Sequence, residues 1–94
     1  MALAYLLRYT TSKPTDILTQ LRAYKERELD RSPPAGFRSA RLLSATDGKT
    51  VAFYSEWDDA DALADMRDSV PWEACMDIND VHADAHEETV FEID

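Results

Sequence analysis

A tryptophan stands where the stretch TVAFYSEWDDADALADM passes from a predicted strand into a predicted helix. The indole of Trp57 combines a flat apolar surface with one N–H donor, which suits the wall of a pocket for a flat aromatic molecule. A donor placed there can also stabilise an anion that forms on the bound ring. The alternative is that Trp57 fills the space between a sheet and its helices, because large inward-facing aromatic residues are mostly core residues.

A second pattern with chemical potential is His82-Ala-Asp84-Ala-His86. On an extended backbone alternate side chains share a face, so two imidazoles and a carboxylate could converge on a metal ion. The segment is predicted to be an acidic loop, however, and metal sites draw their ligands from several elements. We therefore expect no metal. We keep His82 as a candidate general base, because an imidazole exchanges protons near neutral pH.

Other aromatic and sulfur-containing side chains are candidate pocket walls. Trp72 and Met76 fall in a helical stretch that would lie over the same space, as a lid or as core. Tyr5 and Tyr9 lie in the first predicted strand, where their hydroxyls would be polar points in an apolar surface. Cys75 is the single cysteine and has no neighbour that would favour its thiolate, so an inert buried thiol is expected.

Composition and charge exclude several classes of function. The chain has 94 residues and a net charge of −9, with eight basic and four acidic side chains in residues 1–46 against two and fifteen in residues 47–94. This field repels nucleic acids and anionic membranes. Two glycines are too few for a phosphate-binding loop. We predict a cytoplasmic protein without nucleic-acid or membrane partners and without a cofactor.

Hydrophobic periodicity and turn residues divide the chain into strands and helices. Strands are predicted at 2–10, 37–45, 50–57 and 88–93, with a hairpin turn at Asp47-Gly48. A helix should run from the SKPTD segment, capped by Ser12 or Thr15, to about Leu29. A second helix, capped by Asp58 or Asp59, should end near residue 68, and a short helical piece should cover 71–80. This order predicts a single α+β domain, 1–94, with the ferredoxin-like βαββαβ arrangement and a four-stranded antiparallel sheet.

Both faces of the predicted sheet carry apolar side chains. The larger set, expected to face the helices, comprises Leu3, Tyr5, Leu7, Tyr9, Val51, Phe53, Ser55, Trp57, Phe91 and Ile93. The opposite set comprises Leu6, Leu42, Tyr54 and Val90 with Ala4, Ala40, Ala52 and Glu56. A solvated face would be more polar, and each large apolar side chain left in water forgoes roughly 1.5–3 kcal/mol. We therefore predict a homodimer that packs sheet against sheet, a dimeric α+β barrel.

The segment GFRSARLLSATDGKTVAFYSEWDDADAL has a Gly-aromatic strand start, a D-G hairpin and a strand that ends in an E-W-x-(D/S) step into a helix. In these features it resembles the antibiotic biosynthesis monooxygenase family of dimeric α+β barrels. The resemblance covers nearly the whole chain in element order and residues 36–63 in motif. It implies a cofactor-independent monooxygenase acting on an aromatic, polyketide-type small molecule in a cavity between sheet and helices.

The resemblance also implies site residues. It places Trp57 in the cavity wall, and it sets Phe53 where oxygenases of the family carry an asparagine and Leu63 where a tyrosine often follows. We predict Trp57 and His82 as catalytic residues. The predicted substrate-binding residues are Tyr5, Tyr9, Phe53, Trp57, Leu63, Met66, Trp72 and Met76. A polyketide cyclase or isomerase and a non-catalytic small-molecule-binding dimer remain open as alternatives on the same fold.

Overall fold

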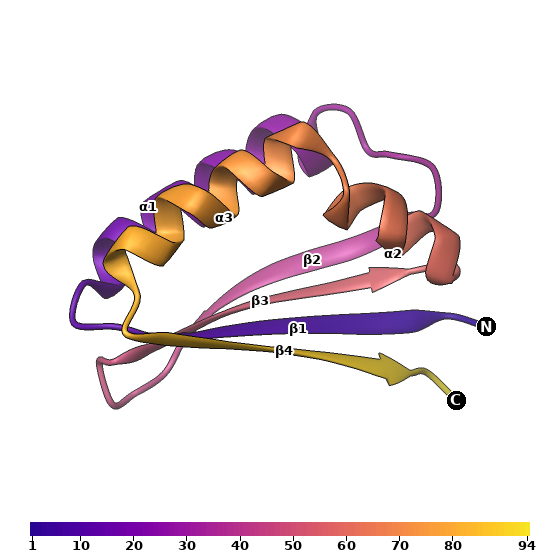
Figure 1. Cartoon of the computed structure of the whole chain (residues 1–94). Helices are drawn as coiled ribbons and strands as arrows, with labels where there is room; N and C mark the ends of the chain where they lie inside the picture. Colours follow the sequence, from indigo (N-terminus) through magenta and orange to yellow (C-terminus); the bar gives the residue numbers. More distant parts are fainter.

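A four-stranded antiparallel sheet in the order β2-β3-β1-β4 forms one layer of the protein. The computed structural model describes all 94 residues. The strands are β1 (Leu3–Thr10), β2 (Phe37–Ser44), β3 (Thr50–Trp57) and β4 (Ala85–Glu92). Together with the helices between them, they confirm the predicted α+β fold of ferredoxin-like type (Figure 1).

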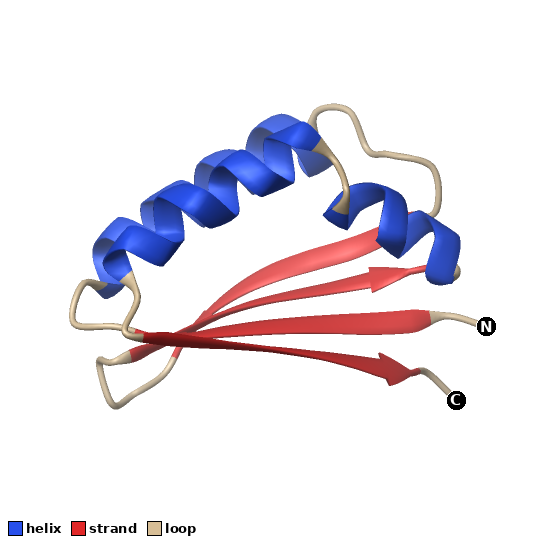
Figure 2. Cartoon of the chain, in the orientation of Figure 1, coloured by secondary structure: helices blue, strands red, loops and turns tan.

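The helices cover one face of the sheet and leave the other face bare (Figure 2). They are α1 (Pro14–Tyr24), its π-helical continuation η1 (Lys25–Asp30), α2 (Ala60–Arg67) and α3 (Val70–His82). No helix is both long enough and apolar enough to span a membrane. Asp59 caps α2 as predicted, because its carboxylate accepts a hydrogen bond from the Ala62 amide at 2.9 Å. The predicted caps Ser12 and Thr15 are wrong: Lys13 precedes α1, without a side-chain cap.

The predicted loop at residues 81–86 is also wrong. His82 is the last residue of α3, and β4 already begins at Ala85. The Asp84 amide donates to the Thr10 carbonyl at 2.8 Å, which brings the chain directly from the helix end into the sheet. The acidic composition suggested a loop, but pairing with β1 extends the strand by three residues. Consequently the two histidines of the HADAH segment lie on different elements, and no group of three potential ligands gathers there.

Strand register corrects the predicted face assignments of four residues in β2 and β4. A β-bulge at Arg38 shifts the alternation of β2, so Ala40 and Leu42 pack against the helix-side core. In β4, Phe91 pairs with Ala4 and Val90 pairs with Tyr5. Because directly paired residues share a face, Phe91 belongs to the bare face and Val90 to the helix face. The bare face, called the open sheet face below, comprises Ala4, Leu6, Arg8, Ser39, Arg41, Leu43, Ala52, Tyr54, Glu56, Glu87, Thr89 and Phe91.

Both glycines have a positive φ, but they differ in surroundings. Gly36 (φ +83°) precedes β2, and a Cβ there would lie 2.5 Å from the Cβ of Ala62 on α2. Gly48 (φ +71°) lies in the confirmed β2–β3 hairpin, where a Cβ would meet nothing. In that turn the Asp47 carboxylate accepts hydrogen bonds from the Lys49 and Thr50 amides, which hold the pKa of Asp47 below its ordinary value.

This difference predicts unequal effects of adding a methyl group. Gly48→Ala should lower the free energy of unfolding by about 1 kcal/mol, the conformational penalty alone. Gly36→Ala should lower it by about 2 kcal/mol or more, because the new Cβ also displaces α2. Urea denaturation of both variants, followed by circular dichroism, measures the difference. Equal losses in the two variants would show that α2 does not press on Gly36.

Candidate functional site

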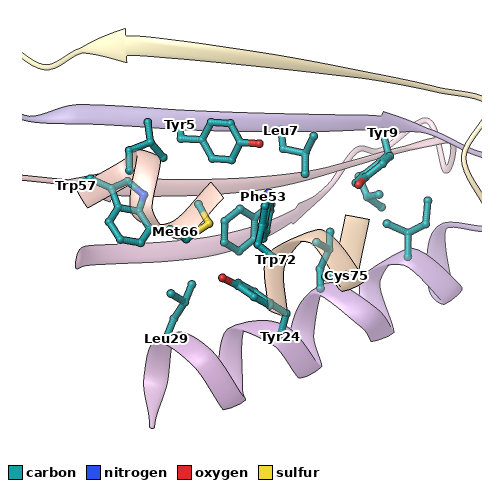
Figure 3. Close-up of a cluster of buried hydrophobic side chains, with 14 residues drawn as sticks. Tyr5, Leu7, Tyr9, Tyr24, Leu29, Phe53, Trp57, Met66, Trp72 and Cys75 are labelled. Atoms are coloured by element: carbon teal, nitrogen blue, oxygen red, sulfur yellow. The ribbon is translucent and has the colours of Figure 1, made fainter. Parts of the chain in front are cut away.

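Trp72 joins the aromatic residues of the helix-side core. Its ring centroid lies 5.1 Å from that of Tyr24, 5.5 Å from Phe53 and 6.1 Å from Tyr5, at angles between 48° and 70°. Figure 3 shows this cluster between β1, β3 and the two long helices. Such tilted and edge-to-face pairs stabilise a core beyond the area that they bury. The sheet and α1 therefore hold Trp72, which lies on α3, in one orientation.

Trp57 lies in the solid part of the core. Its side chain is fully buried, its ring packs edge-on against Phe37 at 5.3 Å, and its indole N–H donates to the Ser55 hydroxyl at 2.9 Å. Trp57 lines none of the four main cavities of the protein. Leu63 and Met66, both on α2, are buried with it. In this conformation the indole has its donor satisfied and offers no surface to a ligand.

His82 lies at the other end of the sheet from Trp57. Its carbonyl accepts a hydrogen bond from the Thr11 hydroxyl at 2.6 Å, just beyond the last residue of β1, whereas Trp57 pairs with the first residue, Leu3. Those two ends of β1 are roughly 23 Å apart at the usual rise of a strand. The Nδ1 atom of His82 is buried without a hydrogen-bond partner. The structure thus does not bring together the two residues predicted as catalytic.

A cleft opens beside Trp72, between α2, α3 and the exposed strand β4. Its volume is about 560 Å³, within the range of small-molecule sites. We call it the acidic cleft; its lining comprises Ala64, Arg67, Asp68, Trp72, Glu73, Met76, Asp77 and Glu88. Trp72 and Met76 are the two predicted binding residues that line it. The sheet-side Tyr9 hydroxyl donates to the Met76 sulfur at 3.1 Å and so helps to hold that wall in place.

A polar cluster borders the acidic cleft, and of its three members the sequence singled out only Tyr5. The Tyr5 hydroxyl donates to Oε1 of Glu88, and Nη2 of Arg67 lies 3.4 Å from the other oxygen, Oε2. The Arg67 guanidinium also lies over the Tyr5 ring, 5.2 Å from its centroid. The three residues come from β1, β4 and α2. One available signal was charge, since Arg67 is one of only two cations in residues 47–94.

Burial keeps the phenols and the thiol of this region protonated. Burial, followed by the hydrogen bond to Glu88, raises the pKa of Tyr5 well above its usual range. Burial likewise raises the pKa of Tyr9, and it raises the pKa of Cys75 to about 11. At neutral pH Tyr5 is therefore a hydrogen-bond donor toward Glu88. Cys75 is a buried neutral thiol, in line with its predicted inertness.

The fold places the protein among ferredoxin-like α+β proteins with one bare sheet face. No protein-family model matches the sequence, and no curated protein sequence matches it. Solved structures do match over nearly the whole chain, at identities that establish the common fold alone. Their similarity confirms the ferredoxin-like arrangement that the sequence predicts.

Antibiotic biosynthesis monooxygenases are among these structural neighbours, as the sequence resemblance implied. A protein from Nitrosomonas europaea assigned to that family superposes with a TM-score of 0.85 at 9% identity, covering 98% of this chain and 89% of its own. SnoaB, a cofactor-independent oxygenase from Streptomyces nogalater, gives 0.79 at 16% identity, with coverages of 99% and 93%. A dimeric ferredoxin-like protein of unknown function from Bacteroides fragilis gives 0.73 at 16%, with coverages of 98% and 96%.

Proposed function

We propose that the protein is a cofactor-independent monooxygenase-like enzyme that binds an aromatic, polyketide-type small molecule in the acidic cleft. The observation that carries this proposal is a ligand-sized cleft that borders the buried aromatic core at Trp72 and has a hydrogen-bonded carboxylate, Glu88, facing it. Trp72 is 3% exposed, so a small part of its buried side chain forms an apolar contact in the cleft wall while the rest belongs to the core. The oxygenase among the structural neighbours supports the choice of reaction, although it shares only the fold with this chain.

The reaction needs little beyond binding and proton transfer. An anthrone-type substrate carries a ring methylene group with an acidic C–H bond. Loss of one methylene proton leaves an electron-rich carbanion. That anion reduces dioxygen and combines with it to give a peroxide, which loses water and leaves a carbonyl. The balanced result is one CH₂ group plus O₂ giving one C=O group plus H₂O. The protein has to orient the ring, accept the proton and stabilise the anion.

The charge of the cleft restricts the ligand further. Four carboxylates, those of Asp68, Glu73, Asp77 and Glu88, surround the single guanidinium of Arg67. This field disfavours phosphorylated and other strongly anionic ligands. A neutral, weakly acidic aromatic ketone or phenol fits the lining better, because it becomes anionic only after it is bound next to Arg67.

The proposal predicts which of the two tryptophans senses the ligand. Titration with anthrone under nitrogen should shift the indole N–H resonance of Trp72 and leave that of Trp57 in place. Trp57→Phe and Trp72→Phe assign the two resonances, since the chain has two tryptophans. Trp72→Leu should weaken binding about tenfold, because a smaller side chain replaces the buried indole that forms this part of the cleft wall. A shift at Trp57 alone would move the site into the core and contradict the cleft assignment.

Oxygen consumption tests the reaction itself. The protein with anthrone, without added flavin or metal, should consume dioxygen and form anthraquinone. A cyclase or isomerase would instead convert a polyketide under nitrogen, using the same proton acceptor. A dimer that binds without turnover would give the Trp72 shift and neither product. These three results separate the proposed function from its two alternatives.

The open sheet face supports a homodimer as the acting species. Leu43 and Phe91 remain 48% and 49% exposed in the single subunit, and Leu6 and Tyr54 lie between them on the central strands. Arg8 and Glu87 form an ion pair on the same face. A second subunit would bury this apolar surface without disturbing the helix layer, which lies on the opposite side (Figure 1). One structural neighbour is itself described as dimeric.

A further inference from the structure

We propose that Glu88 is the general base of the acidic cleft, with Tyr5 as the residue that positions its carboxylate and Arg67 as the counter-charge for the substrate anion. This inference rests on the proposed binding of a weakly acidic aromatic molecule there. The inference goes beyond that function because it assigns the proton acceptor to Glu88, which was not among the site residues predicted from the sequence.

The geometry leaves Glu88 both held and accessible. Tyr5 donates to Oε1 and Arg67 approaches Oε2, so each oxygen has one partner and keeps capacity to accept another hydrogen bond. The Glu88 side chain is 29% exposed, and it faces the cleft. The hydroxyl of Tyr5 cannot compete for the proton, because burial holds it in its protonated form. A bound C–H or O–H acid therefore meets an oriented carboxylate.

The other carboxylates of the cleft lack this support. Asp68 and Asp77 lie on the exposed rim, and neither side chain takes part in a hydrogen bond or an ion pair. Glu73 is likewise exposed, near the start of α3. Only Glu88 is fixed from the sheet by a buried phenol and from the helix layer by a cation. An oriented group within reach of the substrate is what general-base catalysis requires.

The proton transfer is balanced by the substrate, Glu88 and Arg67. The methylene C–H bond of the substrate breaks, its proton passes to a Glu88 oxygen, and its electron pair stays on the ring system. Glu88 becomes neutral and loses its attraction for Arg67. The guanidinium then faces the new aromatic enolate. The negative charge has moved from the Glu88 carboxylate to the substrate and stays beside Arg67.

Hydrogen–deuterium exchange of the anthrone methylene, in D₂O under nitrogen, measures this step without oxygen chemistry. The wild-type protein should accelerate exchange, and Glu88→Gln should reduce the enzymatic rate at least about 100-fold. The amide oxygen of glutamine can still accept from Tyr5, so the fold should be preserved, which the melting temperature verifies. The matched control is Glu87→Gln, because Glu87 is the neighbouring residue on the open sheet face. It should exchange at the wild-type rate.

Tyr5→Phe tests the positioning role. It should lower the maximal exchange rate several-fold and leave the affinity for anthrone unchanged, because the ring remains and only the donor is lost. A loss of affinity with an unchanged maximal rate would assign Tyr5 to binding instead. The inference is overturned if wild-type protein fails to accelerate exchange, or if Glu88→Gln exchanges as fast as wild type. Exchange that depends on Glu88 without any oxygen consumption would uphold the inference and refute the monooxygenase proposal.

Discussion

Trp57→Ala is expected to lower the free energy of unfolding by about 3–5 kcal/mol. The indole is fully buried between Phe37 and the α2 residues Leu63 and Met66. Its removal leaves a cavity that a well-packed core closes only in part. For a small domain whose total stability is about 5–15 kcal/mol, this loss is a large fraction. Urea denaturation followed by circular dichroism measures it.

Two variants separate the packing of Trp57 from its hydrogen bond. Trp57→Phe keeps a ring in the core and should lose about half as much stability as Trp57→Ala. Ser55→Ala removes the acceptor of the indole N–H and should cost about 1–3 kcal/mol, the penalty of a buried unpaired donor. If Trp57→Ala instead leaves stability nearly unchanged and weakens anthrone binding, the indole belongs to a ligand site that opens from this core.

The second large effect is expected on the open sheet face. Leu6→Glu should convert the proposed homodimer into a monomer and raise the dissociation constant at least about 100-fold. Leu6 lies on β1 at the centre of the sheet, paired with Tyr54, so a carboxylate there would be buried between two subunits without a partner. An uncompensated buried charge costs several kcal/mol, which corresponds to two or more orders of magnitude in affinity.

Sedimentation velocity over a range of protein concentrations measures this change. The control is Asp61→Lys, a larger change of charge on the exposed first turn of α2, away from the open sheet face. It should leave the dimer intact. Wild-type protein that sediments as a monomer at micromolar concentration would contradict the dimer, and a Leu6→Glu protein that stays dimeric would place the interface elsewhere.

Local signals in the sequence account for the elements that were predicted correctly. Asp47-Gly48 predicted the hairpin because only a small set of residues tolerates that turn, and Asp59 predicted the start of α2 because its side chain can satisfy a free amide. Such signals act within a few residues. They fail where contact with a distant segment decides the secondary structure. In β4, pairing with β1 makes residues 85–86 of the predicted acidic loop part of the strand.

In the candidate site, too, residue type identified some members, and contacts between distant residues revealed the others. Trp72 and Met76 were identified from residue type, and the structure places both in the cleft wall. Glu88 was not identified, because a glutamate in an acidic segment looks solvated until its partners are known. Those partners, Tyr5 and Arg67, lie 83 and 21 positions away in the chain.

By itself the sequence determined the order of strands and helices, the hairpin and the uneven charge, because each depends on residue type and local spacing. Only the tertiary structure decided which side of β2 and β4 faces the helices. An alternating apolar pattern shows that every second side chain shares a face of the sheet, but it does not show which face. The bulge at Arg38 decides this for β2, and pairing with β1 decides it for β4. That choice brings Glu88 to Arg67 and Tyr5, and it lets part of the Trp72 side chain, but none of Trp57, reach the lining of the cleft.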